Sequence, residues 1–139
     1  KSLDFAKHYA RAGPNPYTGP MVVIVDAGVV SAGETAAGMF KEDGRAYMIG
    51  ESATAGMSSQ KTTLELPSGL FALYVSTASN MGRFNDGKGI EGIGVPPHEI
   101  IEYDPRDLAE GVDTLIKVAE TRLAKFPQSK VPYRAPSGR

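Results

Sequence analysis

The chain of 139 residues has the length of a single domain, and its composition, with 41% hydrophobic and 22% charged residues, is that of an ordinary globular protein. Its formal net charge of -1 argues against a nucleic-acid-binding surface, and no apolar stretch approaches the roughly 20 residues that span a bilayer. With no cysteine and two histidines, the sequence excludes a disulfide framework, a thiolate metal site and a multi-histidine metal site, and we expect no cofactor.

The first half of the chain predicts a strand–helix–strand unit. After a short predicted helix at Leu3–Arg11, the continuous β-branched run Met21–Val25 favours a strand that is covered on both faces, as in a parallel sheet. A helix is expected from about Ser31 to Asp43-Gly44, followed by a second apolar strand at Ala46–Ile49. Two strands joined by a helix within about 30 residues form the βαβ unit.

The second half predicts a hairpin and one long helix. The runs Gln60–Leu66 and Leu70–Thr77 alternate polar and apolar residues around a turn, which is typical of an antiparallel hairpin with one solvated face. Ile90–Val95 is expected to be a short extended piece. A helix should then begin after Asp104, with Pro105 at its first position, and end near Phe126.

The segment Ser31-Ala32-Gly33-Glu34 has two interpretations. As a capping box, the serine accepts a backbone N–H and the glutamate reaches back to the serine N–H. The functional interpretation uses the same geometry, because a serine between a strand and a helix projects into the crevice at the strand ends, where helix N–H groups can stabilise an oxyanion. A serine becomes a nucleophile only with a base.

Other polar residues also have a structural and a functional interpretation. Glu91, set among glycines and aliphatic residues, is either a solvated loop carboxylate or a carboxylate suited to orienting a base. His8 and His98 are ordinary helix and turn residues unless folding brings one of them to Ser31. Lys88 could bind an anion, but it fits a solvated turn charge better.

The order of the short motifs carries a family resemblance. In chain order they are Ser31-Ala32-x-Glu34, Gly44-Arg45-Ala46, Gly50-Glu51, Leu66-Pro67-x-Gly69, Gly87-Lys88-Gly89-Ile90-Glu91 and Gly94-Val95-x-Pro97. From about Pro20 to Phe126 this order resembles the catalytic core of the tail-specific, or C-terminal processing, serine peptidases, whose superfamily includes tricorn protease and interphotoreceptor retinoid-binding protein. The resemblance implies an α/β fold with a ββα-type crotonase/Clp-like core, a mixed sheet, a β-hairpin and a C-terminal helix.

The resemblance also implies roles for individual residues. Ser31 matches the family nucleophile, and the backbone N–H of Ala32 would be one oxyanion donor. Where the lysine-dependent branch carries its base, this chain has Gly56, which excludes a serine–lysine dyad from that loop. Lys61 is offset too far along the hairpin to replace that base. The tricorn-like branch instead uses the serine, a histidine supplied from far upstream, and a glutamate that is bridged to the histidine through a second hydroxyl; Glu91 matches that glutamate.

The expected domain organisation is a partial peptidase-like catalytic core at 1–127 and a flexible tail at 128–139. Because the chain begins at Lys1 with no signal-like segment, we interpret it as a piece of a longer protein whose N-terminal remainder supplies the histidine. The expected function is a serine peptidase that cleaves polypeptides through an acyl-enzyme, with this chain alone inactive or very weakly active. The alternatives are a non-hydrolytic binding module and an assembly fragment. Homo-oligomerisation stays open, no membrane insertion is expected, and the relatives imply the cell envelope or periplasm.

Overall fold

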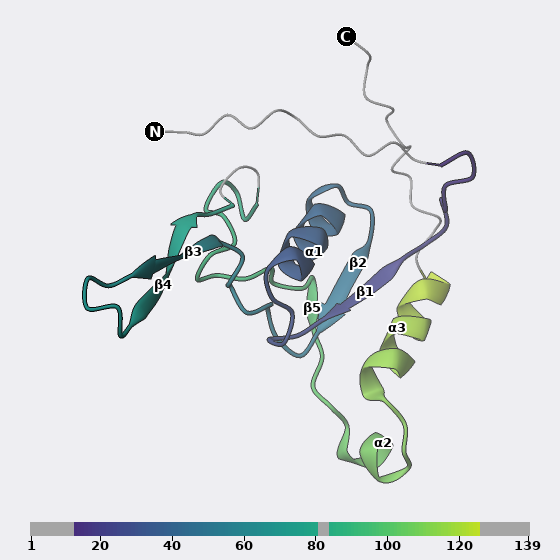
Figure 1. The fold of residues 1–139 in the computed structure, drawn as a ribbon. Helices are drawn as coiled ribbons and strands as arrows, with labels where there is room; N and C mark the ends of the chain where they lie inside the picture. The colour runs from purple at the N-terminus through teal and green to yellow at the C-terminus, as the bar shows by residue number, and fades with distance from the viewer. Residues whose placement is uncertain (1–12, 81–83, 126–139) are drawn as a thin grey trace.

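A three-stranded parallel sheet forms the centre of the protein. The computed structural model describes residues 13–80 and 84–125 (Figure 1). Strands β1 (Val22–Val25), β2 (Tyr47–Gly50) and β5 (Glu99–Ile100) lie in the order β1-β2-β5, and all of them are parallel. The sequence predicted β1 and β2 closely. It did not predict β5, which is only two residues long and is defined by its pairing with β2.

Helices α1 (Ala32–Glu42) and α3 (Thr114–Lys125) cover opposite faces of this sheet (Figure 1). Alternate residues of β1 and β2 pack with Ala37 of α1, while α3 packs against the other side of β1 and β2. The core on the α1 side consists of Val25, Ala37, Met48, Ile90 and Val95, with Val23, Val29 and Phe84 packed against it. The predicted strand–helix–strand unit is therefore present, with its strands parallel.

Coverage of β1 is less complete than the sequence predicted. Val25 is buried, but Val22 and Val23 are half-buried and Ile24 is 38% exposed, because β1 is an edge strand of the sheet. At its carboxyl end β1 approaches β2 so closely that a Cβ on Gly50 would lie 2.0 Å from the Val25 carbonyl oxygen. Only glycine fits at that position.

The predicted hairpin is present as β3 (Gln60–Glu65) and β4 (Ala72–Ala78), joined by a turn at Gly69 (Figure 1). Among the strands that the structure describes, antiparallel pairing is confined to this hairpin, and the central sheet is wholly parallel. The strands thus form two separate sheets rather than the single mixed sheet that we expected. The hairpin is largely exposed, including apolar side chains such as those of Leu70 and Tyr74.

Two further expectations are wrong. Ile90–Val95 is a turn and not an extended piece, because Gly92 and Gly94 adopt φ angles of 74° and 77°. The C-terminal helix is broken into α2 (Pro105–Ala109) and α3. The chain turns at Gly111, whose φ is 71°, and the apolar stripe predicted for one helix is only partly buried.

Some expectations concern residues outside the described ranges. The helix predicted at Leu3–Arg11 and the tail at 128–139 both fall there. Within 13–80 and 84–125, no helix has the length and apolar character needed to cross a membrane, and no group of three or more metal-ligating side chains comes together.

Candidate functional site

Ser31 lies at the sharp turn between β1 and α1, where it is the N-cap residue of the helix. Its backbone has φ 54° and ψ -121°, a conformation that L-residues with a side chain rarely adopt. Such strain of about 1–3 kcal/mol persists only where the surrounding structure imposes it. The side chain is exposed, beside the first turn of α1, so the hydroxyl is accessible to a substrate at a helix N-terminus.

The buried carboxylate of Glu34 holds this turn in place. It is fully buried, and its Oε2 accepts the backbone N–H of Ser31 at 3.1 Å, which is the glutamate half of the predicted capping box. The same oxygen accepts the N–H of Met57 at 2.8 Å, and Oε1 accepts the Thr54 hydroxyl at 2.7 Å and the Gly56 N–H at 2.6 Å. With four donors, a buried carboxylate is well satisfied, and it ties the serine turn to the loop at 51–59.

Gly56 joins this loop to the turn that carries Glu91. Its N–H donates to Glu34, and its carbonyl oxygen accepts the N–H of Gly92 at 2.8 Å. Its φ is 72°, and a Cβ there would lie 3.0 Å from the Ile93 nitrogen and 3.1 Å from the Gly92 nitrogen. A side chain at position 56 would therefore be both strained and crowded by backbone.

Glu91 is held by the last residue of the same loop. Its Oε2 accepts the backbone N–H of Ser59 at 2.7 Å, and its Oε1 accepts the Ser59 hydroxyl at 3.0 Å. The Ser59 hydroxyl also lies 2.7 Å from the hydroxyl of Ser76 on β4 and 3.1 Å from the ammonium of Lys61 on β3. We name these four residues, Glu91, Ser59, Lys61 and Ser76, the Glu91 cluster.

The electrostatics of the cluster favour an ionised carboxylate. Desolvation raises the pKa of Glu91, but the hydrogen bonds from the Ser59 backbone and hydroxyl, the charge of Lys61 and the backbone of Ser58 outweigh it. The pKa of Glu91 therefore lies below its ordinary value of 4.5. Glu91 is exposed, so it is accessible to a further partner.

The other predicted residues have different surroundings. Ala32 is the first residue of α1, so its N–H is one of the helix-start donors that have no partner within the helix. His98 precedes β5, stacks on Tyr47 with ring centroids 5.0 Å apart, and accepts the Met48 N–H through Nδ1 at 2.9 Å. Burial and then Lys41 lower the pKa of His98. Lys88 is an exposed turn residue, and His8 lies outside the described residues.

Three contributors to the site were not identified from the sequence. The sequence placed Glu34 in a capping box but gave no sign of its bonds to the loop at 51–59, which span 20 to 23 residues. Ser59 and Lys61 were not paired with Glu91, because that contact joins segments 32 residues apart. A serine and a lysine two positions apart at a strand start are a weak signal by themselves.

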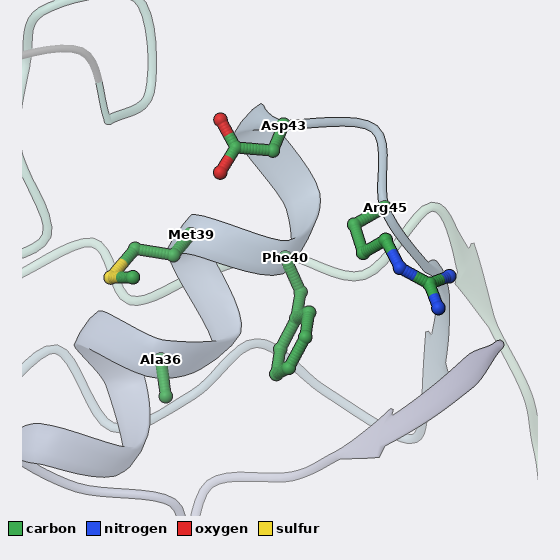
Figure 2. A pocket seen from close by; sticks show the side chains of 5 residues that line it. All are labelled: Ala36, Met39, Phe40, Asp43 and Arg45. Carbon is green, nitrogen blue, oxygen red and sulfur yellow. The ribbon is translucent and has the colours of Figure 1, made fainter. Parts of the chain in front are cut away.

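A separate pocket of about 220 Å³ lies on the outer side of α1 (Figure 2). It is lined by Ala36, Met39, Phe40, Asp43 and Arg45. The Arg45 guanidinium donates to the carbonyl oxygens of Gly19 at 3.1 Å and Tyr17 at 2.8 Å, so it holds the chain before β1. None of the predicted site residues lines this pocket.

The fold and the sequence together define the class of the protein. The fold is α/β, and the family described as Peptidase family S41 matches residues 3–101 of the chain. The chain belongs to this family, as its motifs indicated.

Three relatives are similar over most of the chain. The Chlamydia pneumoniae protein CPj1016/CpB1054 is 31% identical over 84% of the chain, which is 20% of that protein. The carboxy-terminal-processing protease of Bartonella bacilliformis is 29% identical over 88% of the chain and 27% of its own length. The carboxyl-terminal-processing protease of Picosynechococcus is also 29% identical, over 70% of the chain and 22% of its own length. The chain thus spans about a fifth to a quarter of these relatives.

A solved structure is similar in fold. The structure of mature CPAF complexed with lactacystin superposes with a TM-score of 0.62 at 21% sequence identity. The superposition covers 79% of this chain and 22% of the CPAF chain. At that identity the similarity supports the α/β fold.

Proposed function

We propose that this chain is the catalytic core of a serine peptidase that cleaves peptide bonds through an acyl-enzyme at Ser31. Glu91 orients and stabilises a histidine base, which a segment outside this chain supplies. The backbone N–H of Ala32 is one donor to the oxyanion. Membership of a peptidase family and the exposed serine at a strained strand–helix turn support this assignment.

In this mechanism the histidine takes the proton from the Ser31 hydroxyl as the oxygen attacks the peptide carbonyl carbon. The carbonyl oxygen becomes an oxyanion that the Ala32 N–H stabilises at the positive end of α1. The C–N bond then breaks, and the leaving amine takes the proton from the histidine. Water, deprotonated by the same histidine, hydrolyses the serine ester and restores the hydroxyl.

The observation that carries the proposal is the connection from the serine turn to the glutamate turn through one glycine. Gly56 donates to Glu34, which accepts the Ser31 N–H, and it accepts from Gly92, the neighbour of Glu91. Two polar groups 60 positions apart are thereby fixed to the same short loop. A rigid link of this kind is what a nucleophile and the orienter of its base require.

A fluorophosphonate probe tests the proposal on the intact protein that carries this chain. We expect the probe to label wild-type protein and Ser68→Ala, whose serine is exposed in the hairpin turn, but not Ser31→Ala. Glu91→Gln should label more slowly by about a hundredfold or more, because the histidine loses its anionic partner. Labelling of Ser31→Ala at the wild-type rate, or no labelling of wild-type protein at any pH, would refute the proposal.

The second candidate is a non-hydrolytic module that binds a ligand or peptide on the same fold. Gly56 favours it, because a glycine cannot take a proton at the position where the resemblance would place a lysine base. A protein that binds extended peptides but leaves them uncleaved, and that ignores the probe, would support this candidate.

Finer features follow from the family. We propose a crotonase-like arrangement of the complete core, polypeptide substrates, and action in the cell envelope or periplasm. The N-terminal remainder of the parent protein would supply the histidine and a second oxyanion donor. Light scattering on the intact protein tests for a homo-oligomer, and fractionation of the cell envelope tests the location.

A further inference from the structure

The hydrogen bonds around Ser59 leave its hydroxyl no freedom. A serine hydroxyl has one proton to donate and two lone pairs that accept. The proton goes to Glu91 Oε1 at 3.0 Å, so the hydroxyl of Ser76, 2.7 Å away, and the ammonium of Lys61, 3.1 Å away, must both donate to the Ser59 oxygen. Ser59 is 7% exposed, and every hydrogen-bonding position of its oxygen is filled. Because an ionised carboxylate only accepts hydrogen bonds, the bond between Ser59 and Glu91 requires Ser59 as its donor.

The hairpin delivers both of these donors. Lys61 on β3 and Ser76 on β4 are cross-strand partners, so their side chains stand on the same face of the hairpin. The hairpin pairing has a register irregularity between Gln60 and Lys61, at the end of β3 next to Ser59. The Lys61 ammonium also lies 3.4 Å from the Ser59 carbonyl oxygen, so it bridges two oxygens of one residue.

Building on the proposed function, we propose that Ser59 and Lys61 are positioning residues for Glu91. Ser59 holds the carboxylate with two hydrogen bonds, and Lys61 holds the Ser59 hydroxyl in the orientation that donates to Glu91. The hairpin β3–β4 thereby supports the site with a lysine that acts as a fixed cation and transfers no proton.

Charge supports the same conclusion. Among the residues that the structure describes, the charged group that lowers the pKa of Glu91 is Lys61, with Ser58 and Ser59 contributing hydrogen bonds. A cation in this place stabilises the anionic form of Glu91 and also raises the energy of a protonated histidine beside it. Loss of the cation must raise the pKa values of both groups, since both then sense a more negative field.

The test is the pH dependence of probe labelling in the intact protein. Lys61→Met should shift the acid limb of the rate profile to higher pH, with labelling about two- to fivefold slower near pH 6 and close to wild type at pH 9. Lys61→Arg, which keeps the charge, should restore most of the wild-type profile. Ser59→Ala should be slower by about tenfold, because it removes a donor to the carboxylate.

Ser68→Ala is the matched control. The Ser68 hydroxyl lies in the exposed turn of the same hairpin, where it accepts the N–H of Leu70 at 3.3 Å, so its removal leaves the Glu91 cluster intact. This variant should keep the wild-type profile. Urea unfolding of each variant separates loss of folding from loss of positioning.

The outcomes distinguish the two proposals. A wild-type protein that labels at Ser31, together with a Lys61→Met variant whose profile is unshifted, overturns the positioning role alone. A wild-type protein that does not label overturns the peptidase and with it the role of Lys61. If Lys61→Met does not fold, Lys61→Gln is the second variant. It also removes the charge, so it should shift the acid limb to higher pH, and an unshifted limb contradicts the proposal.

Discussion

Glu34 accepts the backbone N–H of Ser31 at 3.1 Å while it lies fully buried beneath the turn that carries this serine. The residue that begins as a local helix cap is thus also the centre of a long-range network. Because Glu34 also binds Thr54, Gly56 and Met57, the shape of the serine turn depends on a loop about 25 residues further along the chain.

Replacing Glu34 by glutamine should destabilise the protein by about 2–4 kcal/mol. A glutamine amide presents one acceptor oxygen and one NH2 group, so the NH2 group faces donors that the second carboxylate oxygen had accepted. Urea unfolding of the intact protein measures the change, with Glu120→Gln on the exposed side of α3 as the control within about 0.5 kcal/mol. Equal midpoints for the two variants would contradict the network.

The strained backbone of Ser31 predicts an unusual order of stabilities. Ser31→Gly should be more stable than Ser31→Ala by about 1 kcal/mol, because glycine accepts φ 54° freely whereas alanine retains the strain. Both variants lack the hydroxyl, so the comparison isolates the backbone. Thermal unfolding of the pair gives the difference, and a more stable alanine variant would show that the turn is relaxed.

The stability cost of crowding at Gly56 can be measured separately from the cost of its positive φ. Gly56→Ala should cost about 2–4 kcal/mol, from the left-handed backbone and from contact with the Ile93 and Gly92 backbone. Gly69→Ala is the matched control, because its φ of 68° is similar and nothing lies within 4 Å of the added Cβ. It should cost only the 1–2 kcal/mol of the backbone, as urea unfolding would show. Equal losses would mean that the loop at 51–59 can move away.

The start of α3 depends on Asp113. Its Oδ1 accepts the N–H groups of Leu115 at 2.8 Å and Ile116 at 3.1 Å, which is the pattern of an N-terminal cap. Asp113→Ala should therefore destabilise the protein by about 0.5–2 kcal/mol, and Asp113→Asn, which also caps, by much less. Thermal unfolding checks the order, and an asparagine variant as unstable as the alanine variant would count against capping.

Part of the loss of stability at low pH should come from the ion pair between Glu99 of β5 and Arg122 of α3. Arg122 donates to Glu99 through Nε at 2.7 Å and through a second guanidinium nitrogen, and these bonds hold the pKa of Glu99 below its ordinary 4.5. A carboxyl with a lowered folded pKa stabilises the protein above its unfolded pKa, and this stabilisation is lost as the pH falls through the folded value.

Glu99→Gln should therefore lose less stability between pH 5 and pH 3 than the wild-type protein does. Unfolding curves at several pH values measure the slope, and Arg122→Met should flatten it in the same way, since it removes the partner. A glutamine variant with the wild-type slope would show that Glu99 contributes nothing to acid unfolding.

The local sequence pattern predicted those elements that depend mainly on their own residues. The β-branched run before Asp26 predicted β1, and the capping box at Ser31 predicted α1. The alternation of polar and apolar residues around Gly69 predicted the hairpin. The break between α2 and α3 also had a local signal in Gly111 and Asp113, but the apolar stripe across it suggested one helix. Periodicity alone does not detect a turn that preserves the apolar spacing.

The features that the sequence did not predict are those that depend on contacts between distant segments of the chain. The short strand β5 exists through its pairing with β2, and the turn at 90–94 depends on glycines that the aliphatic residues around them obscured. Ser31 and Glu91 were predicted as members of one site from a resemblance. The residues that support them, Glu34, Ser59 and Lys61, act across 20 to 32 positions, a range that no local rule covers.

The crowded glycine in the loop at 51–59 bears on the choice of inhibitors. Position 56 is where the family resemblance would place a lysine, and here a Cβ would lie 3.0 Å from the Ile93 nitrogen and 3.1 Å from the Gly92 nitrogen. Compounds designed to condense with such an amine have no target in this loop. Selectivity between lysine-bearing members of the family and this protein can therefore be sought in that one difference.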